Sequence, residues 1–504
     1  MSAATTNAAV ALKADRADTS GAERVGLLIG GASRAAATGA VFARRNPVSG
    51  EVVTVAAAAS IRDVDAAVTA AAAAFPAWSQ QGPGERRRRL LLAADGMERR
   101  LDDFVGRMMR ETGATRGWSM FNVFEAARML REAASMTTQI TGEVIPSDLP
   151  GNVAYGVRRP VGVLVGIAPW NAPIILGTRA IAMPLACGNT VILKASEACP
   201  GLQVLIGDVL QEAGLGDGIV NVLTHAPEDA AAVVDRLISH PLTRRINFTG
   251  STRVGRIIAE KAGRALKPVL LELGGKAPMV VLDDADLDQA VDAAIFGAFM
   301  NQGQICMSTE RIVVTAGIAD GFVAQFAARA ANLAVADPLV ADAPLGALVD
   351  LAAAARVSEL VADAQARGAV IAAGGTRTGV LMAATVVDRV TPEMRIYHEE
   401  SFGPVTTIVR VADDAEAVRV ANDTEFGLSA AVFSRDIVRA MAVARQIDSG
   451  ICHINGPTVH DEPQMPFGGT KASGYGRFGG KAGIAEFTEL RWLSVQTTPR
   501  HYPF

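Results

Sequence analysis

The spacing of hydrophobic positions changes once along the chain, close to Gly151. From about residue 60 to residue 135, alanine-rich segments repeat with helical spacing and contain few β-branched residues and little glycine or proline. After Gly151, short β-branched runs alternate with helical stretches. This alternation is typical of a parallel sheet that is covered by helices on both faces.

The β-branched runs fall into two series, which predicts two α/β domains with doubly wound parallel sheets. The first series comprises residues 161–167, 190–193, 219–223, 245–248 and 269–273. The second comprises residues 279–282, 311–315, 369–371, 406–410, 430–433 and 450–454. The two domains are therefore expected to join near residues 272–276. A chain of 504 residues also exceeds what one hydrophobic core usually serves.

Two further segments, residues 152–159 and 487–496, alternate in strand fashion and carry no obvious site residue. An unpaired strand edge of this kind would be an aggregation hazard in a monomer. Residues 1–24 lack a positive region followed by an apolar block, so we expect a loose tail and no secretion signal. The longest strongly apolar stretches, such as residues 161–168, are far shorter than the ~18 residues that span a bilayer. We therefore expect no transmembrane helix.

The composition argues against nucleic acid and anionic membranes as binding partners. Half of the residues are apolar, charges of both signs are plentiful and the formal net charge is −4, which gives no electrostatic argument for nucleic acid or an anionic membrane. The four cysteines, Cys187, Cys199, Cys306 and Cys452, are far apart and form no C-x-x-C pair. This pattern predicts reduced thiols in the cytoplasm and no metal site.

Three short patches carry candidate chemistry. Cys306 lies in residues 299–311 among polar residues and glycine, Asn171 ends the run Pro-Trp-Asn, and Glu272 begins the run Glu-Leu-Gly-Gly-Lys. Glycine allows a ligand to approach the backbone closely. We interpret the three as a nucleophile, an oxyanion donor and a base that activates water. The alternatives are a packed core cysteine, a turn asparagine and a strand-end glutamate that points to solvent.

These residue types suit the oxidation of an aldehyde to an acid. A planar carbonyl cannot readily expel hydride until a nucleophile makes it tetrahedral, and a thiolate does this well. A rigid amide and a backbone N–H, here those of Asn171 and Cys306, would stabilise the resulting oxygen anion. The remaining thioester must be released by water, and a carboxylate in a mostly apolar site has a raised pKa that suits it to activate that water.

The three patches, in this order and at roughly these separations, resemble the aldehyde dehydrogenase superfamily. Four more segments extend the resemblance, namely residues 194–197, 248–251, 399–404 and 466–471, and it covers nearly the whole chain after about residue 25. The resemblance implies NAD-dependent oxidation of an aldehyde. It also implies an NAD-binding domain (25–145 and 160–273), a catalytic domain (274–470), and a protruding β segment (146–159 and 485–500) that pairs subunits in a homodimer or homotetramer.

One cofactor contact follows from the residue pattern. Residues 248–255 predict a strand and a glycine-rich turn into a helix, with Gly250, Ser251 and Gly255 at the turn. The first amides of such a helix can hold a pyrophosphate. A plain strand–helix turn would look similar, and the G-x-x-x-x-G spacing differs from the usual dinucleotide fingerprint but is similar to the family's version.

The resemblance supplies the other cofactor contacts. It assigns Lys194 and Glu197 to the adenosine ribose, Glu400 and Phe402 to the nicotinamide ribose and ring, and Trp170 to the cofactor in general. A carboxylate at Glu197 would repel the 2′-phosphate of NADP, which favours NAD. The alternatives for Glu400 and Phe402 are an exposed loop acid and a core aromatic residue.

One position departs from the family. A lysine is often found nine residues after the oxyanion asparagine, and this chain has Ala180 there, preceded by Arg179. Arg179 is a candidate for a proton relay or for substrate binding. A helix-surface arginine is the alternative.

The substrate is the least determined feature. Residues 172–180 and 453–460 are similar to family members that oxidise aromatic aldehydes such as salicylaldehyde, vanillin or benzaldehyde. Tyr155, Trp170, Arg179 and Ile305 are candidates for the pocket of an aromatic ring, and core packing is the alternative. Three rivals stay open: a CoA-acylating enzyme, which Glu272 argues against; an aliphatic or semialdehyde dehydrogenase; and a binding or structural protein that kept the fold.

Overall fold

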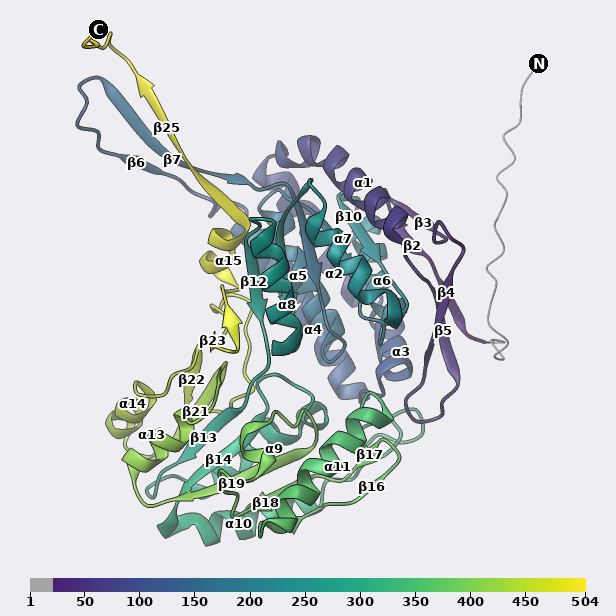
Figure 1. Ribbon diagram of the computed structural model, residues 1–504, viewed down its shortest axis with the longest axis vertical. Coiled ribbons are helices and arrows are strands. Elements are labelled where there is room, and N and C mark those ends of the chain that lie inside the picture. Colours follow the sequence, from purple (N-terminus) through teal and green to yellow (C-terminus); the bar gives the residue numbers. More distant parts are fainter. Residues whose placement is uncertain (1–20) are drawn as a thin grey trace.

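The structure is a computed structural model and describes residues 21–504. Two lobes lie one above the other, and a three-stranded arm projects away from them (Figure 1). The predicted tail, residues 1–24, lies outside the described residues as far as Ser20. Residues 23 and 24 belong instead to the strand β1 (Glu23–Val25), because they pair in parallel with β5 (Val52–Ala57).

The predicted helical region is confirmed. It holds four helices: α1 (Ile61–Ser79), α2 (Pro83–Arg99), α3 (Leu101–Thr112) and α4 (Arg116–Met136). Local chemistry sets the boundary between the last two. Gly113 takes a φ of 71°, which stops α3. Thr115 then caps α4, because its hydroxyl accepts a hydrogen bond from the backbone N–H of Trp118.

The upper lobe is built on an eight-stranded sheet. Its centre is parallel, in the order β12-β11-β8-β9-β10, and β24, β2 and β3 extend the edges. The bounds are β2 (Leu27–Ile29), β3 (Ala32–Arg34), β8 (Val163–Ile167), β9 (Thr190–Lys194), β10 (Val220–Leu223), β11 (Thr243–Thr249), β12 (Val269–Glu272) and β24 (Gly474–Tyr475). A small sheet of β1, β5 and β4 (Val41–Arg45) lies beside it.

Side chains alternate along the central strands, so both faces of this sheet are covered. Val163, Val165 and Ile167 pack with α1, α7 (Ala230–Ser239) and α8 (Thr252–Arg264). Leu164 packs on the other face with α4, α5 (Pro173–Ala186) and α6 (Pro200–Glu212). The sheet is therefore doubly wound, as predicted. Its strand order reverses between β8 and β11, the point at which such sheets bind ligands.

The lower lobe has a seven-stranded sheet in the order β15-β18-β19-β14-β13-β21-β22, parallel except for β15. The strands are β13 (Ala277–Val281), β14 (Thr309–Thr315), β15 (Val370–Ala373), β18 (Thr385–Asp388), β19 (Val405–Val411), β21 (Ser429–Phe433) and β22 (Ile451–Ile454). Met279 and Val281 pack with α9 (Leu287–Phe299) and α10 (Ala316–Ala331). Val280 packs with α11 (Leu351–Ala366), α13 (Asp414–Asn422) and α14 (Ile437–Ala444).

Every strand predicted from the β-branched runs is present. The chain passes from the upper sheet to the lower sheet between residues 272 and 277. Glu272 ends β12 in the upper sheet and Ala277 begins β13 in the lower one. The remaining short elements are β16 (Arg377–Thr378), β17 (Leu381–Met382), β20 (Phe426–Gly427), β23 (Thr470–Lys471), α12 (Arg395–His398) and α15 (Gly480–Phe487). The unpredicted strands are those before residue 60, β6, β18 and the two-residue strands β16, β17, β20, β23 and β24.

The arm consists of three antiparallel strands: β6 (Glu143–Ile145), β7 (Asn152–Pro160) and β25 (Thr488–Gln496). It extends well away from the body (Figure 1). Several of its apolar side chains are open to solvent, including Val144 at 72% and Trp492 at 75% exposure. The two segments predicted to alternate in strand fashion therefore lie together here.

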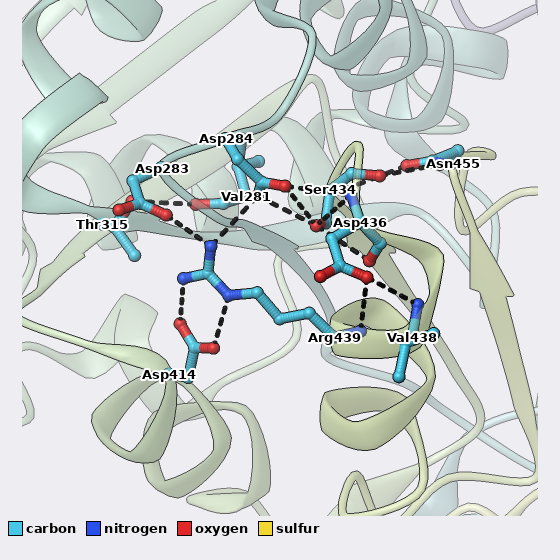
Figure 2. A network of polar contacts seen from close by, with 10 residues as sticks. All are labelled: Val281, Asp283, Asp284, Thr315, Asp414, Ser434, Asp436, Val438, Arg439 and Asn455. Carbon is cyan, nitrogen blue, oxygen red and sulfur yellow. Dashed lines mark hydrogen bonds and ion pairs between the residues drawn. The ribbon is translucent and has the colours of Figure 1, made fainter.

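A polar network at one end of the lower sheet fastens α13 and α14 (Figure 2). Arg439 on α14 pairs with Asp283, Asp284 and Asp414 at 2.6, 3.2 and 2.6 Å. Asp436 caps the same helix by accepting from the backbone N–H of Arg439. None of the predicted site residues belongs to this network, so Arg439 is a suitable control position for substitutions in the site.

Candidate functional site

The candidate residues lie at opposed edges of the two sheets. Asn171 follows the carboxyl end of β8, and Glu272 is the last residue of β12. Cys306 comes just before β14, at the amino edge of the lower sheet, and Glu400 lies before β19. All four line one cavity of about 520 Å³, which we call the sheet cavity.

A second cavity of about 460 Å³ meets the first at the nucleophile candidate. We call it the helix cavity, because α4, α5 and α9 supply much of its wall. Cys306, Asn171 and Leu176 line both cavities. The sulfur is therefore not sealed in a core. It lies where the two cavities join, with the amide and the carboxylate candidates beside it.

An unusual turn sets the position of Cys306. Asn301, Gln302 and Gly303 have φ values of 48°, 56° and 68°, so three successive residues are left-handed. For the first two this conformation is costly and must be held by contacts. Asn301 Nδ2 donates to the backbone carbonyl of Asn171, and Gln302 Nε2 donates to that of Ala347, both at 3.0 Å.

Glycine at position 275 lets the loop that carries Cys306 approach residues 273–276, which connect the two sheets. A Cβ on Gly275 would lie 2.3 Å from the backbone carbonyl oxygen of Cys306, and one on Gly274 would lie 2.9 Å from Glu400 Oε2. No side chain fits at position 275, because the atom that it would meet belongs to the backbone. A side chain at position 274 would displace the carboxylate of Glu400.

Asn171 is buried, and both its side-chain amide and its backbone carbonyl make hydrogen bonds. Its Nδ2 donates to the backbone carbonyl of Gln304 at 3.0 Å, and its own carbonyl accepts from Trp118 Nε1 at 3.1 Å. A carboxamide carries two N–H groups. One anchors the loop before Cys306, and the second remains for an oxyanion.

Glu272 is 1% exposed, and neither of its carboxylate oxygens makes a hydrogen bond within the described chain. Burial raises the pKa of Glu272 to about 7. Burial, followed by the charge of Glu272, also raises the pKa of the Cys306 thiol well above its usual range. The pair therefore rests as a thiol beside a carboxyl group that titrates near neutrality. The solvent-pointing alternative for Glu272 is excluded.

Part of the sheet cavity suits a dinucleotide. Gly250 and Ser251 line it where β11 turns into α8, and the Ser251 hydroxyl accepts from the N–H of Val254. This strand–turn–helix is the one predicted, and the positive end of α8 points to where a pyrophosphate could bind. Gly255 does not line the cavity. A Cβ on Gly255 would lie 2.4 Å from Leu273, so the glycine lets α8 pack closely against residues 273–276, which connect the two sheets.

The other end of the sheet cavity is aromatic and acidic. Trp170 and Phe402 meet edge to face, with ring centroids 5.7 Å apart. Glu400 Oε1 accepts from the N–H of Gly275 at 2.9 Å, and burial raises the pKa of Glu400 to about 7. Lys194, the last residue of β9, pairs with Glu197 at 3.8 Å, and neither residue lines this cavity.

The helix cavity is mostly apolar, with charged groups at one side. Arg179 is 8% exposed, so the helix-surface reading is wrong. Its guanidinium pairs with Asp461 and lies 4.2 Å from the ring centre of Phe467. Ile305 lines the cavity as predicted. Tyr155 does not, because it lies in β7 of the arm, paired with Leu493 and Val144.

Several lining residues escaped the sequence reasoning. They are Trp118, Phe121, Glu125 and Arg128 on α4, Phe296 on α9, and Asp461 and Phe467 near the C-terminus. Val459 and His460, which also line the cavity, lie in the segment 453–460 that carried the aromatic-aldehyde resemblance. The α4 set recurs at helical spacing, which could have marked one face of that helix. The pattern does not tell whether that face meets a core or a cavity.

The described residues contain few other chemical groups. Across residues 21–504 no cluster of three His, Cys, Asp or Glu side chains could hold a metal ion. All four cysteines, which lie in that span, are free thiols. No helix within the same residues is long and apolar enough to cross a membrane.

Comparison with known proteins agrees with this geometry. The profile of the Aldehyde dehydrogenase family matches residues 34–493. A vanillin dehydrogenase of Pseudomonas fluorescens is 60% identical over 95% of this chain and 99% of that protein. A salicylaldehyde dehydrogenase of Pseudomonas putida is 50% identical over 92% of this chain and 96% of that protein.

A solved structure extends the comparison to the fold. The crystal structure of a salicylaldehyde dehydrogenase from Pseudomonas putida, complexed with salicylaldehyde, matches with a TM-score of 0.94 and 49% identity. The match covers 96% of this chain and 100% of that one. The chain belongs to the aldehyde dehydrogenase family and is an oxidoreductase that acts on aldehydes with NAD or NADP.

Proposed function

We propose that this enzyme oxidises aromatic aldehydes to carboxylic acids and prefers NAD. The observation that carries the proposal is the helix cavity, which opens onto Cys306 and has Trp118, Phe121 and Phe296 in its wall. Its volume of about 460 Å³ and its flat apolar sides suit an aromatic ring. The relatives at 50–60% identity, which bear the names of two aromatic aldehydes, support the same substrate class.

Charge in the helix cavity argues against the semialdehyde alternative. A semialdehyde carries a carboxylate, which would need an unpaired cation. Both arginines in the wall already have acidic partners, since Arg179 pairs with Asp461 and Arg128 pairs with Glu125. An additional anion would therefore meet local acidic charge, whereas a neutral aromatic aldehyde would not.

The proposed reaction begins at Cys306. Glu272 takes the thiol proton, and the sulfur attacks the carbonyl carbon to give a thiohemiacetal. The second N–H of Asn171 and the backbone N–H of Cys306 stabilise the oxygen anion. A bound nicotinamide supplies the acceptor for the hydride. Glu272 then releases the thiol proton to solvent and is free to act as a base again. A water attacks the thioester carbon as its proton passes to Glu272, the C–S bond breaks, and the carboxylic acid leaves while Cys306 is restored.

The nucleotide would lie along the edge of the upper sheet. In this proposal the amides around Gly250 and Ser251 bind the pyrophosphate, Lys194 and Glu197 bind the adenosine ribose, and Glu400 holds the other ribose. Trp170 and Phe402 enclose the ring. The acidic side chain of Glu197 supports NAD over NADP, because a 2′-phosphate would be repelled. Four free cysteines support a cytoplasmic location.

The decisive experiment is a panel of aldehydes assayed for NADH formation. Benzaldehyde, salicylaldehyde and vanillin are compared with short-chain aldehydes and with succinate semialdehyde, each with NAD and with NADP. We expect kcat/KM to be at least about tenfold higher for the aromatic group, since ring burial contributes more than 1.4 kcal/mol. Turnover that requires CoA, or a preference for short-chain substrates, would contradict the proposal.

The oxyanion role of Asn171 gives a prediction. Asn171→Ala should lower kcat/KM by about 10²–10³, because one preorganised donor is lost. The rate of Cys306 alkylation by iodoacetamide serves as the control for loop position. A kcat/KM equal to that of the wild type would contradict the assignment.

We also propose that the arm pairs subunits in a homodimer or homotetramer. Its edge strand β25 exposes Leu490, Trp492 and Val495, which water-exposed strands rarely do in a monomer. Trp492→Asp should reduce the mass measured by light scattering toward the 52.4 kDa of one chain. Val438→Asp, at a residue 79% exposed on α14, should leave the mass unchanged. A wild-type mass of a single chain would contradict the proposal.

A further inference from the structure

The loop that carries Glu400 and Phe402 is fixed by three charged side chains, of which Lys276 and Glu310 are buried and Arg356 is half-buried. We propose that Lys276, Glu310 and Arg356 form a clamp that positions Glu400 and Phe402 for the nicotinamide end of the cofactor. The inference rests on the proposed cofactor contacts of those two residues. Lys276 and Glu310 do not line the sheet cavity and act through the loop, so they are positioning residues. Arg356 also lines that cavity, so the double variant of Lys276 and Glu310 is the test that isolates the effect of loop position.

Glu310 is the centre of the clamp. Its Oε1 accepts from the backbone N–H of Ser401 at 2.9 Å, from the Ser401 hydroxyl at 2.9 Å and from the N–H of Phe402 at 3.0 Å. Its Oε2 accepts from Lys276 Nζ at 2.7 Å. One buried carboxylate therefore binds two successive backbone donors of the loop, as well as the lysine.

Two cations hold the carbonyl groups of the same loop. Lys276 Nζ donates to the carbonyl of Glu399 at 2.7 Å. Arg356 on α11 donates to the carbonyl of Glu400 at 2.8 Å and to that of Ser401 at 2.7 Å. Three consecutive carbonyls and two consecutive N–H groups are thus bound by side chains, which leaves the loop little freedom.

The loop has a conformation that it would not adopt unaided. Phe402 has a φ of 47°, in the left-handed region that an aromatic residue avoids at a cost of about 1–2 kcal/mol. That conformation allows the backbone N–H of Phe402 to reach Glu310 while the ring meets Trp170. The clamp supplies the contacts that offset the strain.

The position of the clamp links it to the nucleophile. Lys276 lies just before β13, Glu310 lies in β14 and the loop lies before β19, and these three strands are neighbours. Glu310 follows Cys306 by four residues. A Cβ on Gly303, in the turn before Cys306, would lie 2.0 Å from the carbonyl oxygen of Gly403. The loop therefore packs directly on the turn that presents Cys306.

Stability alone is a poor explanation for this ion pair. The side chains of Lys276 and Glu310 are 0% and 4% exposed. Burying two charges costs more than burying apolar residues of the same size unless hydrogen bonds offset the loss of water. Here those hydrogen bonds all run to one loop, which is the loop with the proposed cofactor contacts.

Arg356→Met is the first test, because it removes two hydrogen bonds without leaving a buried charge. We expect the dissociation constant of NADH, measured by fluorescence, and the KM for NAD to rise at least about tenfold, as loss of charge-assisted bonds predicts. The KM for the aldehyde and the rate of Cys306 alkylation should stay within about twofold. Arg439→Met, in the network of Figure 2, is the matched control and should change none of these quantities.

The second variant combines Glu310→Gln with Lys276→Met, so that neither charge is left without a partner. The same rise is expected, with a melting temperature close to that of the wild type. Folded variants that bind NADH as the wild type does would overturn the clamp. So would loss of Cys306 alkylation in parallel with NADH binding, because that result indicates a general structural role. A wild-type protein that neither binds NADH nor reduces NAD would overturn the proposed function instead.

Discussion

Replacing Cys306 with alanine is expected to reduce aldehyde-dependent NADH formation by more than about 10³-fold. The reason is chemical, because the carbonyl stays planar without the sulfur and hydride cannot leave. Geometry supports the choice of this thiol, since Cys306 lies where the sheet cavity and the helix cavity meet. The measurement is the steady-state rate with benzaldehyde and with vanillin, together with the binding of NADH, which should be retained.

Cys452 offers the matched control for that result. It is a free thiol and is the exposed one of the four cysteines. Cys452→Ala should leave kcat/KM unchanged, because the residue lines neither cavity. Substantial turnover in Cys306→Ala, or a comparable loss in Cys452→Ala, would refute the assignment of the nucleophile.

Glu272→Gln is expected to lower steady-state turnover by about 10²–10⁴, the usual contribution of a general base. The loss should fall mainly on hydrolysis of the thioester. The charge of Glu272 contributes to the raised pKa of Cys306, so its removal makes the thiolate easier to form. The first turnover should therefore be slowed less than later ones. A burst of NADH of about one per site should appear, and intact mass should reveal acyl-enzyme.

The pH profile provides an independent check on the same residue. Because the pKa of Glu272 is about 7, the carboxylate form that accepts protons is lost as pH falls through 7. Wild-type kcat should rise with pH across that region, and Glu272→Gln should lack the inflection. An unchanged inflection in the variant, or an absence of acyl-enzyme, would assign the base to another group.

Much of the fold could be predicted because it depends on local periodicity. The helical region before residue 136, the central parallel strands of the upper sheet, all strands of the lower sheet except β18, and the passage from Glu272 to Ala277 follow from the spacing of apolar residues and from glycine. The strands before residue 60 were missed. β1, β2 and β3 are only three residues long, and β4 is partly exposed, so none of them has a long β-branched run. β5 contains the β-branched run of residues 52–55 and was overlooked.

The sequence also supplied the candidates for the chemical groups of the site. Cys306, Asn171 and Glu272 stood out because their neighbours are unusual for core residues. The sequence placed Tyr155 in the strand segment 152–159 and also among the pocket candidates. The structure keeps only the first, because Tyr155 pairs within the arm and does not line the helix cavity. The sequence did not decide between a site role and a helix-surface position for Arg179. Its partner Asp461 is distant in the chain, and packing decides whether the side chain is buried.

By itself, the sequence determined most of the secondary structure, the family resemblance and the candidates for the reactive side chains, because these depend on residues close together in the chain. Only the tertiary structure decided the pKa of about 7 at Glu272, the pairing of Arg179 with Asp461 and the binding of the Glu400 loop by Glu310. The physical reason is that desolvation and hydrogen bonding depend on which distant segments meet. Here they meet where the carboxyl edge of one sheet faces the amino edge of the other.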